Sequence, residues 1–369
     1  MKIVVFGNYP RWLIQFRGPM LKKMKEKGHC VYACAPFASE DVKTQLSDIG
    51  VKYTHIPLFR EGLNPLNELK TLICFYLFLL KIKPDCLFVY TVKPVIFGSF
   101  AAKLAGINKI VSMIEGLGFV YTESDSGSSS WLKFCVNFLY RISLKFSSKI
   151  LFLNQDDYSY FSDSKLIDKN QGVVLDGTGV DLEYYCPVPL PERISFVMIA
   201  RLIKEKGVYE YVRAAEIIKD EFPWVEFTLV GWIDEHPSSF SLKELGQLLA
   251  KGCVNYVGRL EDVRPAIRGA SVYVLPSYRE GLPRTIQEAM AMARPIITTD
   301  VPGCRQTVVN GVNGFKVPPR NIQKLAEAMK KFIINPELVG KMGYQSRIMA
   351  VSRFNKDDIT EKIMKIMEL

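Results

Sequence analysis

Short apolar runs and longer amphipathic stretches alternate along the whole chain. Residues 3–6, 86–90 and 272–275 are apolar or aromatic throughout, as in strands buried on both faces, and 208–220 has apolar residues at helical spacing. Strands that alternate with helices favour parallel sheets covered by helices on both faces, so the pattern predicts an α/β protein. Further strands are expected at 29–35, 52–57, 109–114, 149–154, 173–175, 194–200, 226–230, 254–257 and 295–298, and further helices at 16–27, 64–81, 95–105, 131–146, 242–250, 263–268, 284–293 and over most of 321–369.

A proline-rich segment divides this pattern into two parts of similar size. Residues 186–191 read Cys-Pro-Val-Pro-Leu-Pro, and a strand pattern begins again at 194. Domain boundaries often fall in linkers of this composition. We therefore predict one domain over residues 1–187 and a second over 188–349.

The expected helix at 64–81 is apolar around most of its surface, and Lys70, Lys81 and Lys83 flank it. Two interpretations stay open: a helix buried in the core, or a helix that lies on a membrane surface. No membrane span is expected, because the chain has no uncharged apolar run of the roughly 18 residues that a span requires. The strand at 3–6 begins so early that no signal peptide is expected.

The net charge of +10 comes entirely from the first part of the chain. Residues 1–155 hold 20 Lys and Arg against 10 Asp and Glu, whereas residues 156–369 hold 28 of each. A basic half favours an anionic partner such as nucleic acid, lipid headgroups or a diphosphate-bearing substrate, or it provides a soluble surface only. Nucleic acid is not expected, because the sequence has no helix-turn-helix, zinc module or aromatic RNA-binding signature.

The eight cysteines are scattered and indicate neither a metal site nor a disulfide framework. The nearest pair, Cys30 and Cys34, lies on an expected strand, and the sequence has no Cys-x-x-Cys. The histidines His29, His55 and His236 do not stand at ligand spacing from these thiols. We expect buried free thiols in a reducing cytosol.

Two glutamates lie where an expected strand, a loop and a helix meet. Glu280 is in the loop after the strand at 272–275, and Glu288 is in the following helix, about two turns further on. Both carboxylates can face one pocket beside the helix N-terminus, whose free N–H groups suit a phosphate. Two surface glutamates at this spacing by chance are the alternative.

Two cations follow another strand in the same way. Arg201 and Lys206 come after the strand at 194–200 and just before a helix. In open α/β sheets, ligands bind at the carboxyl ends of the strands. A guanidinium and an ammonium at that place suit a diphosphate, although solvated surface cations are the alternative.

The segments around these residues carry a set of motifs in a fixed order: A-R-L-x3-K-G, L-V-G, Y-V-G-R, P-S-Y-x-E-G-L-P-x4-E-A-M-A, D-V-P-G-C and N-G-x-N-G. With these motifs, the stretch 201–314 resembles the C-terminal domain of the retaining family-4 glycosyltransferases, which have the GT-B fold. The resemblance implies two facing, Rossmann-like, doubly wound α/β domains with an interdomain cleft. It also implies that 188–349 binds a nucleotide sugar and that a last helix, 350–369, packs back on the acceptor-binding first domain.

The resemblance also implies a role for each candidate residue of the second domain. Arg201 and Lys206 would bind the donor diphosphate, Glu280 would contact hydroxyls of the transferred sugar, and Glu288 would bind the ribose. The remaining donor contacts that it implies are Gly281, Leu282, Pro283 and Thr285 near sugar and phosphate, Arg259 and Leu260 near the base, and Gly7 of the first domain, which would close over the donor.

In the first domain, residues 16–21 and 115–121 resemble bacterial enzymes that extend a sugar on undecaprenyl diphosphate in O-antigen, capsule or glycoprotein glycan assembly. This narrower resemblance implies acceptor contacts for Arg17, Lys93 and Glu115, with a phosphate as the ligand of Arg17. Many family members carry a histidine where this chain has Glu115. The carboxylate would orient the acceptor hydroxyl or support positive charge on the sugar ring, or it is only satisfied by backbone N–H groups.

We therefore expect a retaining hexosyltransferase that moves N-acetylhexosamine or galactose from a UDP-sugar to an undecaprenyl-diphosphate-linked saccharide. Glu115, Arg201, Lys206 and Glu280 are the expected catalytic residues. No cofactor and no metal are expected, because the chain lacks Asp-x-Asp and the two cations already supply positive charge at the diphosphate.

We expect the enzyme at the cytoplasmic face of the inner membrane, bound to the leaflet through its basic first domain. The alternatives are a UDP-sugar epimerase of the same fold, a transferase with a soluble acceptor, and a non-catalytic protein that binds anionic membrane surfaces.

Overall fold

The computed structural model describes residues 1–59, 64–117, 121 and 128–369, and it divides into two compact units. The first unit comprises Met1–Thr178 with Asp357–Leu369, and the second comprises Gly179–Lys356. The division thus falls nine residues before the predicted boundary at 187/188, because the proline-rich segment belongs to the second unit. Residues 124–130 are serine- and glycine-rich, which predicts a polar loop, and they lie for the most part outside the described residues.

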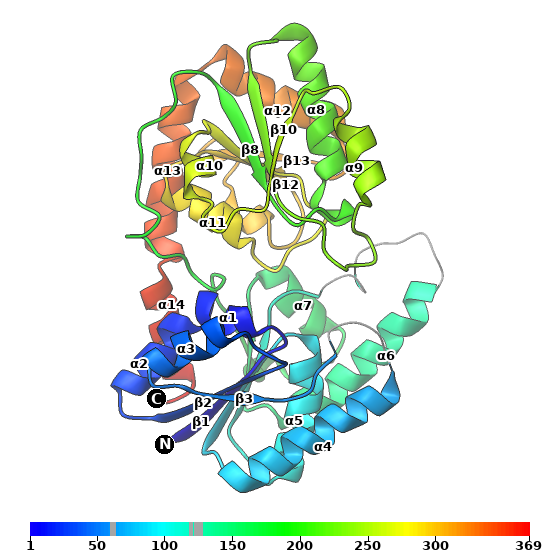
Figure 1. The fold of residues 1–369 in the computed structure, drawn as a ribbon, viewed down its shortest axis with the longest axis vertical. Helices are drawn as coiled ribbons and strands as arrows, with labels where there is room; N and C mark the ends of the chain where they lie inside the picture. The colour runs from blue at the N-terminus through cyan, green and yellow to red at the C-terminus, as the bar shows by residue number, and fades with distance from the viewer. Residues whose placement is uncertain (60–63, 118–120, 122–127) are drawn as a thin grey trace. The chain divides into compact units, whose positions relative to one another are not determined.

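The first unit is built on a seven-stranded sheet in the order β3-β2-β1-β4-β5-β6-β7, and each described strand pair is parallel. The strand order runs outward in one direction from β1 to β3 and in the other from β4 to β7, so it reverses between the neighbouring strands β1 and β4. Helices cover the sheet on both sides (Figure 1). The strands are β1 (Lys2–Phe6), β2 (Cys30–Ala35), β3 (Lys52–His55), β4 (Cys86–Tyr90), β5 (Ile110–Ile114), β6 (Lys149–Phe152) and β7 (Gly172–Val174). The helices are α1 (Pro10–Gln15), α2 (Gly18–Glu26), α3 (Glu40–Asp48), α4 (Pro65–Ile82), the π-helical turn Pro94–Gly98 that runs into α5 (Ser99–Leu104), α6 (Ser128–Ser143) and α7 (Gln155–Asp163).

The second unit repeats this architecture with six parallel strands in the order β10-β9-β8-β11-β12-β13. The predicted fold class, two doubly wound α/β domains, is therefore confirmed. The strands are β8 (Ser195–Ile199), β9 (Glu226–Val230), β10 (Asn255–Gly258), β11 (Val272–Leu275), β12 (Ile296–Thr299) and β13 (Gly314–Val317). The helices are α8 (Val208–Glu221), α9 (Leu242–Leu249), α10 (Arg264–Arg268), α11 (Arg284–Ala291), α12 (Ile322–Ile334) and α13 (Glu337–Arg353).

The end of the chain returns to the first unit through α14 (Lys356–Ile366), which Figure 1 shows in red next to α2. An ion pair of 2.5 Å joins Lys23 to Glu361, and another of 2.6 Å joins Lys109 to Glu368. The return begins at Asp357 and not at 350 as predicted, because α13 continues to Arg353 within the second unit.

A buried arginine attaches the linker to the second unit. Arg294 is fully buried, and its guanidinium donates to the carbonyl oxygens of Val188 and Pro189 in the linker at 3.0 Å. It also donates to the carbonyls of Ile267, Arg268 and Met292 at 3.0–3.2 Å. Burial lowers the pKa of Arg294 to about 10, so the side chain stays charged at neutral pH. The linker therefore lies fixed along the domain.

The predicted helix at 64–81 is α4, and neither of its two interpretations describes it fully. Its inner face, including Phe75 and Leu79, is buried in the core of the first unit. Its outer face exposes an apolar stripe at helical spacing, and α6 exposes a second stripe of aromatic residues. The exposed members are Leu66, Leu69, Ile73, Leu77 and Leu80 of α4 and Trp131, Phe134 and Phe138 of α6.

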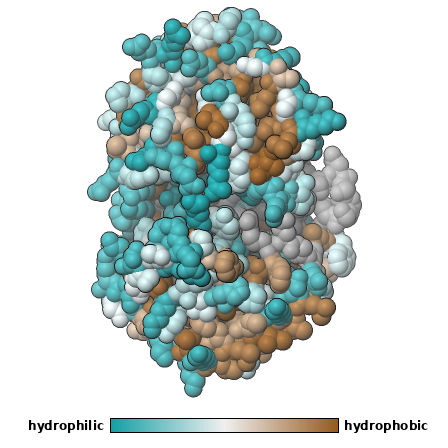
Figure 2. Space-filling view, viewed as in Figure 1, coloured by the Kyte–Doolittle hydropathy of each residue, from teal (hydrophilic) through white to brown (hydrophobic). Residues whose placement is uncertain are grey.

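We call these eight side chains the apolar face of the first domain. Figure 2 shows apolar atoms gathered where α4 runs along the surface of this domain. Lys70, Lys81 and Lys83 are exposed beside the α4 stripe. Among the helices that the structure describes, none combines the length and the apolar composition that a membrane span requires.

Candidate donor and acceptor sites

The carboxyl ends of β8 and β11 bring Lys206 and Glu280 together in the second unit. The Lys206 ammonium donates to the Glu280 carboxylate, and the Ser277 hydroxyl donates to the same oxygen at 2.7 Å. The side chains of Lys206 and Glu280 are 18% and 11% exposed, so the pair is mostly shielded from water. Lys206 and Glu280 were predicted from separate motifs 74 positions apart, and they form one ion pair.

Two glycines let the backbone segments of this site approach each other. Gly207 has φ +74°, and a Cβ there would lie 2.3 Å from the Pro276 carbonyl oxygen. Gly303 has φ +80°, and a Cβ there would lie 2.4 Å from the Glu280 carbonyl oxygen. Contacts under 3.0 Å are essentially never seen for a real Cβ, so only glycine fits at these two positions.

Arg201 stands after β8 but is directed to another partner. Its guanidinium donates to Asp234 at 2.9 Å, and the Asp234 carboxylate also accepts from the Ser239 hydroxyl at 2.7 Å. These hydrogen bonds outweigh the effect of burial and lower the pKa of Asp234. Asp234 was not predicted. A carboxylate shortly after the strand next to β8 was the available signal, because parallel strands place their carboxyl ends on one edge.

Glu288 lies on α11 and is 7% exposed. Arg284, one turn earlier, donates to it at 3.1 Å, and the Tyr185 phenol is a further hydrogen-bond partner. Burial raises the pKa of Glu288, and Arg284 and Tyr185 only partly oppose this. A buried carboxylate of this kind is suited to accept hydrogen bonds from neutral hydroxyl groups.

Tyr273 of β11 is fully buried behind the carboxyl end of β8. The Tyr273 hydroxyl donates to the Ile199 carbonyl at 3.0 Å, two residues before Arg201. Burial raises the pKa of Tyr273, and the charges of Glu288 and Glu280 raise it further. Thr285 hydrogen-bonds to the same phenol. Thr285 therefore contacts Tyr273, whereas Arg284 and Tyr185 hold Glu288 and Asp234 holds Arg201.

The other predicted donor residues occupy the rim of this region. Leu282 and Pro283 are buried between Glu280 and α11, and Gly281 is partly exposed. Arg259 and Leu260 follow the edge strand β10, where the Arg259 guanidinium lies 5.1 Å from the centre of the Trp232 ring. An aromatic ring and a cation at this end of the sheet give a base a surface on which to stack.

In the first unit, the predicted acceptor residues Arg17 and Glu115 form a direct ion pair. Arg17 is 1% exposed and also donates to the Met113 sulfur at 3.0 Å. Its guanidinium lies 4.7 Å from the ring centre of Tyr90 and 5.8 Å from that of Phe88. Burial raises the pKa of Glu115, and the charge of Arg17 opposes this rise.

Gly7 and Lys93 have local partners in the first unit. A Cβ at Gly7 would lie 2.1 Å from the Tyr90 ring, so packing within the first domain already requires glycine there. The Lys93 ammonium donates to Glu68 at 2.6 Å. Lys93 is therefore held by α4 through Glu68.

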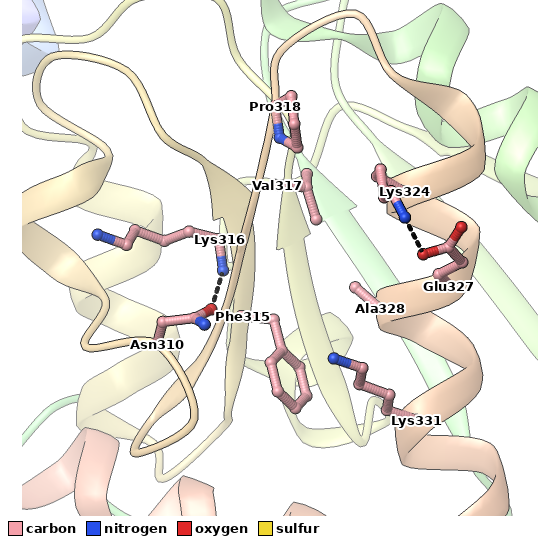
Figure 3. Close-up of a pocket in the computed structure, with 9 residues that line it drawn as sticks. All are labelled: Asn310, Phe315, Lys316, Val317, Pro318, Lys324, Glu327, Ala328 and Lys331. Atoms are coloured by element: carbon pink, nitrogen blue, oxygen red, sulfur yellow. Dashed lines mark hydrogen bonds and ion pairs between the residues drawn. The ribbon is translucent and has the colours of Figure 1, made fainter.

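The described residues form no metal cluster, and the predicted site residues do not line the pocket between β13 and α12. Among the described residues, no group of three or more His, Cys, Asp or Glu could hold a metal ion. A pocket of about 210 Å³ lies between β13 and α12, where Lys331 approaches the Phe315 ring and Lys324 bonds to Glu327 (Figure 3). No predicted site residue lines it.

Comparison with known proteins identifies the family. Residues 189–349 match the model of glycosyl transferases group 1, and residues 19–154 match the model of glycosyl transferase 4-like proteins. The chain is a glycosyltransferase. Both its domains are therefore assigned to one enzyme class, and the motifs around Arg201 and Glu280 belong to the matched region.

Two curated relatives show the similarity over most of the chain. The N,N'-diacetylbacillosaminyl-diphospho-undecaprenol alpha-1,3-N-acetylgalactosaminyltransferase of Campylobacter jejuni is 26% identical over 100% of this chain and 98% of its own. The UDP-Gal:alpha-D-GlcNAc-diphosphoundecaprenol alpha-1,3-galactosyltransferase of Escherichia coli is 25% identical over 88% and 85%. The crystal structure of HepE from Anabaena with UDP-glucose is 18% identical, with a TM-score of 0.78 over 100% of this chain and 99% of its own. This likeness shows that the glycosyltransferase has the GT-B fold.

Proposed function

We propose that this glycosyltransferase transfers N-acetylgalactosamine or galactose from a UDP-sugar to a saccharide on undecaprenyl diphosphate, with retention of the anomeric configuration. The observation that carries the proposal is the Lys206–Glu280 ion pair, a cation and an acid that are mostly shielded from water at the carboxyl ends of β8 and β11. The names of the Campylobacter jejuni and Escherichia coli relatives support the choice of donor and acceptor.

In the proposed reaction, the acceptor hydroxyl attacks the anomeric carbon on the face from which UDP leaves. A diphosphate oxygen takes the proton, so no enzymic nucleophile is needed. Lys206 and Arg201 would exchange their present partners, Glu280 and Asp234, for the diphosphate, and their charge would stabilise the leaving group in the transition state. Glu280 would then be released to accept hydrogen bonds from hydroxyls of the transferred sugar.

We propose further that the reaction needs no metal ion. The positive charge that a divalent cation would bring to the diphosphate would come from Arg201 and Lys206. Addition of EDTA is expected to leave the transfer rate unchanged, and a rate restored only by Mg²⁺ or Mn²⁺ would contradict this part.

The membrane partner that we propose is the cytoplasmic leaflet, bound through the apolar face of the first domain. The α6 stripe contains Trp131, 71% exposed, and Phe134, 68% exposed, and exposed lysines flank the α4 stripe. Aromatic side chains and lysines in one surface match the interface of an anionic bilayer. Such binding would bring the enzyme to the lipid diphosphate.

Transfer is tested by incubating the protein with a panel of UDP-sugars and short-chain lipid-diphosphate sugars, with mass spectrometry as readout. Arg201→Ala and Lys206→Ala are each expected to lower kcat/KM about tenfold or more, because a charged contact contributes roughly 1.5–3 kcal/mol. Lys204→Ala is the matched control, since Lys204 is on the same segment but 59% exposed. Near-wild-type rates for both variants would refute the site. Conversion of the UDP-sugar to its epimer without acceptor would indicate an epimerase instead.

Membrane binding is tested by flotation with vesicles of phosphatidylethanolamine and phosphatidylglycerol. Trp131→Ser with Phe134→Ser is expected to weaken binding at least tenfold, because each aromatic side chain loses about 1.5–3 kcal/mol of apolar burial. Trp224→Ser, which removes a tryptophan that is 49% exposed in the second unit, is the control. Equal flotation of both variants would contradict the proposed surface.

A further inference from the structure

Four polar side chains stand at one edge of the first sheet, where the carboxyl ends of the neighbouring strands β1, β4 and β5 lie. Asn8 follows β1, Thr91 follows β4, Tyr90 is the last residue of β4, and Glu115 follows β5. The crossover of this sheet changes direction between β1 and β4. Ligands in open α/β sheets bind at such a switch point, outside the carboxyl ends of the strands.

Several polar atoms at this edge have no hydrogen-bond partner among the described residues. They are the Tyr90 hydroxyl and the Arg17 Nε, in side chains that are 0% and 1% exposed, and the Asn8 Oδ1 and Thr91 Oγ1. A Cβ at Gly7 would lie 2.2 Å from the Tyr90 hydroxyl, which therefore touches the loop that contains Asn8. Buried polar groups are nearly always paired, so such a cluster indicates a ligand that supplies the partners.

The backbone at Thr91 supports the same interpretation. Thr91 has φ +69°, a conformation that is rare for any residue with a side chain and rarer still for a β-branched one. Strain of this kind is retained mainly at functional sites. The strained residue adjoins Tyr90, so the two observations fall on the same loop.

The charge at this edge decides what kind of ligand it suits. The buried Arg17 guanidinium is neutralised by Glu115 and covered by the rings of Tyr90 and Phe88. A formally neutral pair offers little attraction for a diphosphate, whereas hydroxyl and amide groups together with a carboxylate match the hydroxyl groups of a sugar.

We propose that Asn8, Tyr90 and Thr91 join Glu115 in binding the hydroxyls of the acceptor's terminal sugar, and that Arg17 positions Glu115 instead of binding phosphate. The inference rests on the proposed transfer to a lipid-linked saccharide and specifies which part of that acceptor the first domain reads. Asn8, Tyr90 and Thr91 are then specificity-determining residues.

Tyr90→Phe is the sharpest test, because it removes only the unpartnered hydroxyl and keeps the ring beneath Arg17. Its kcat/KM for the acceptor is expected to fall about three- to tenfold, the effect of one hydrogen bond to a sugar. UDP affinity and the slow hydrolysis of UDP-sugar without acceptor are expected to stay at wild-type values. Thr91→Ala is expected to act like Tyr90→Phe, and Thr91→Ser to keep the wild-type rate. Lys22→Ala, at an exposed position of α2, is the matched control.

Two acceptors separate sugar from phosphate recognition: the lipid-diphosphate saccharide and an alkyl glycoside of the same saccharide. Tyr90→Phe is expected to lower transfer to both by the same factor. A loss seen only with the diphosphate acceptor, a wild-type rate for the variant, or an equal loss of donor hydrolysis would each overturn the inference. If the wild-type enzyme transfers to neither acceptor, the proposed function itself fails, and this outcome is distinct from the other three.

Discussion

Gly7→Ala is the substitution for which the structure makes the sharpest stability prediction. Gly7 follows β1, and its φ lies outside the left-handed region that favours glycine. On backbone grounds alone, alanine would stabilise the fold by about 0.4–1 kcal/mol, since it restricts the unfolded chain. Packing opposes this gain, because the added Cβ would lie 2.1 Å from the Tyr90 Cζ.

The Tyr90 ring has no room to move aside. Tyr90 is fully buried, and Arg17 lies 4.7 Å from its ring centre. Overpacking in a core of this kind costs about 1–3 kcal/mol, which exceeds the backbone gain. We therefore expect a net loss of about 1–2 kcal/mol, or a midpoint about 2–8 °C lower for a domain of this size.

The measurement is thermal or urea unfolding of wild type, Gly7→Ala and Gly18→Ala. Gly18 begins α2, and a Cβ there would meet nothing within 4 Å, so this control is expected to equal or exceed wild type in stability. Gly7→Ala at wild-type stability or above would refute the reasoning, because it would show that the Tyr90 ring moves aside without lowering the free energy of unfolding.

Three further predictions concern the buried polar groups. Arg294→Met is expected to destabilise the second unit by more than about 3 kcal/mol in urea unfolding, because five carbonyl groups lose their donor; an unchanged midpoint would contradict this. The raised pKa of Glu288 means that the folded state binds more protons than the unfolded state, so stability falls as pH rises above 4.5. The thermal midpoint of Glu288→Gln should therefore rise relative to that of wild type as the pH increases from about 4.5 to 7, and a difference that stays constant with pH would contradict this prediction. In the native protein the exposed Cys186 should react first with a thiol reagent, whereas Cys304, whose pKa burial raises to about 12, should react only after unfolding; fast labelling of Cys304 would contradict its burial.

The sequence was sufficient for most elements whose pattern is continuous and apolar. The strands at 86–90, 226–230 and 272–275 were predicted with the bounds that the structure shows, because a strand buried on both faces reads as an unbroken apolar run. Helices α1, α3 and α7 and strand β13 were missed. The three helices are short, with six residues in α1 and nine each in α3 and α7, and β13 is a four-residue strand among glycines, so local pattern identifies none of them well.

For the candidate site as well, the sequence predicts some residues, whereas their partners are seen only in the structure. The motifs predict Lys206, Glu280 and Glu288 as site residues from residue type and order alone, because strand ends and helix starts are local features. The partners that these residues take are not local. Asp234 holds Arg201, Tyr185 binds Glu288, and each comes from a segment that the motifs do not contain.

The sequence by itself determined the two-domain α/β architecture and which residue types gather at its strand ends, since both depend on spacing along the chain. Tertiary structure alone decided which charges neutralise each other. It placed Arg17 on Glu115 across 98 residues and left the Tyr90 hydroxyl against Gly7. The physical reason is that an ion pair or a buried hydroxyl is defined by distances of a few ångströms, and those distances are set when the parallel strands align.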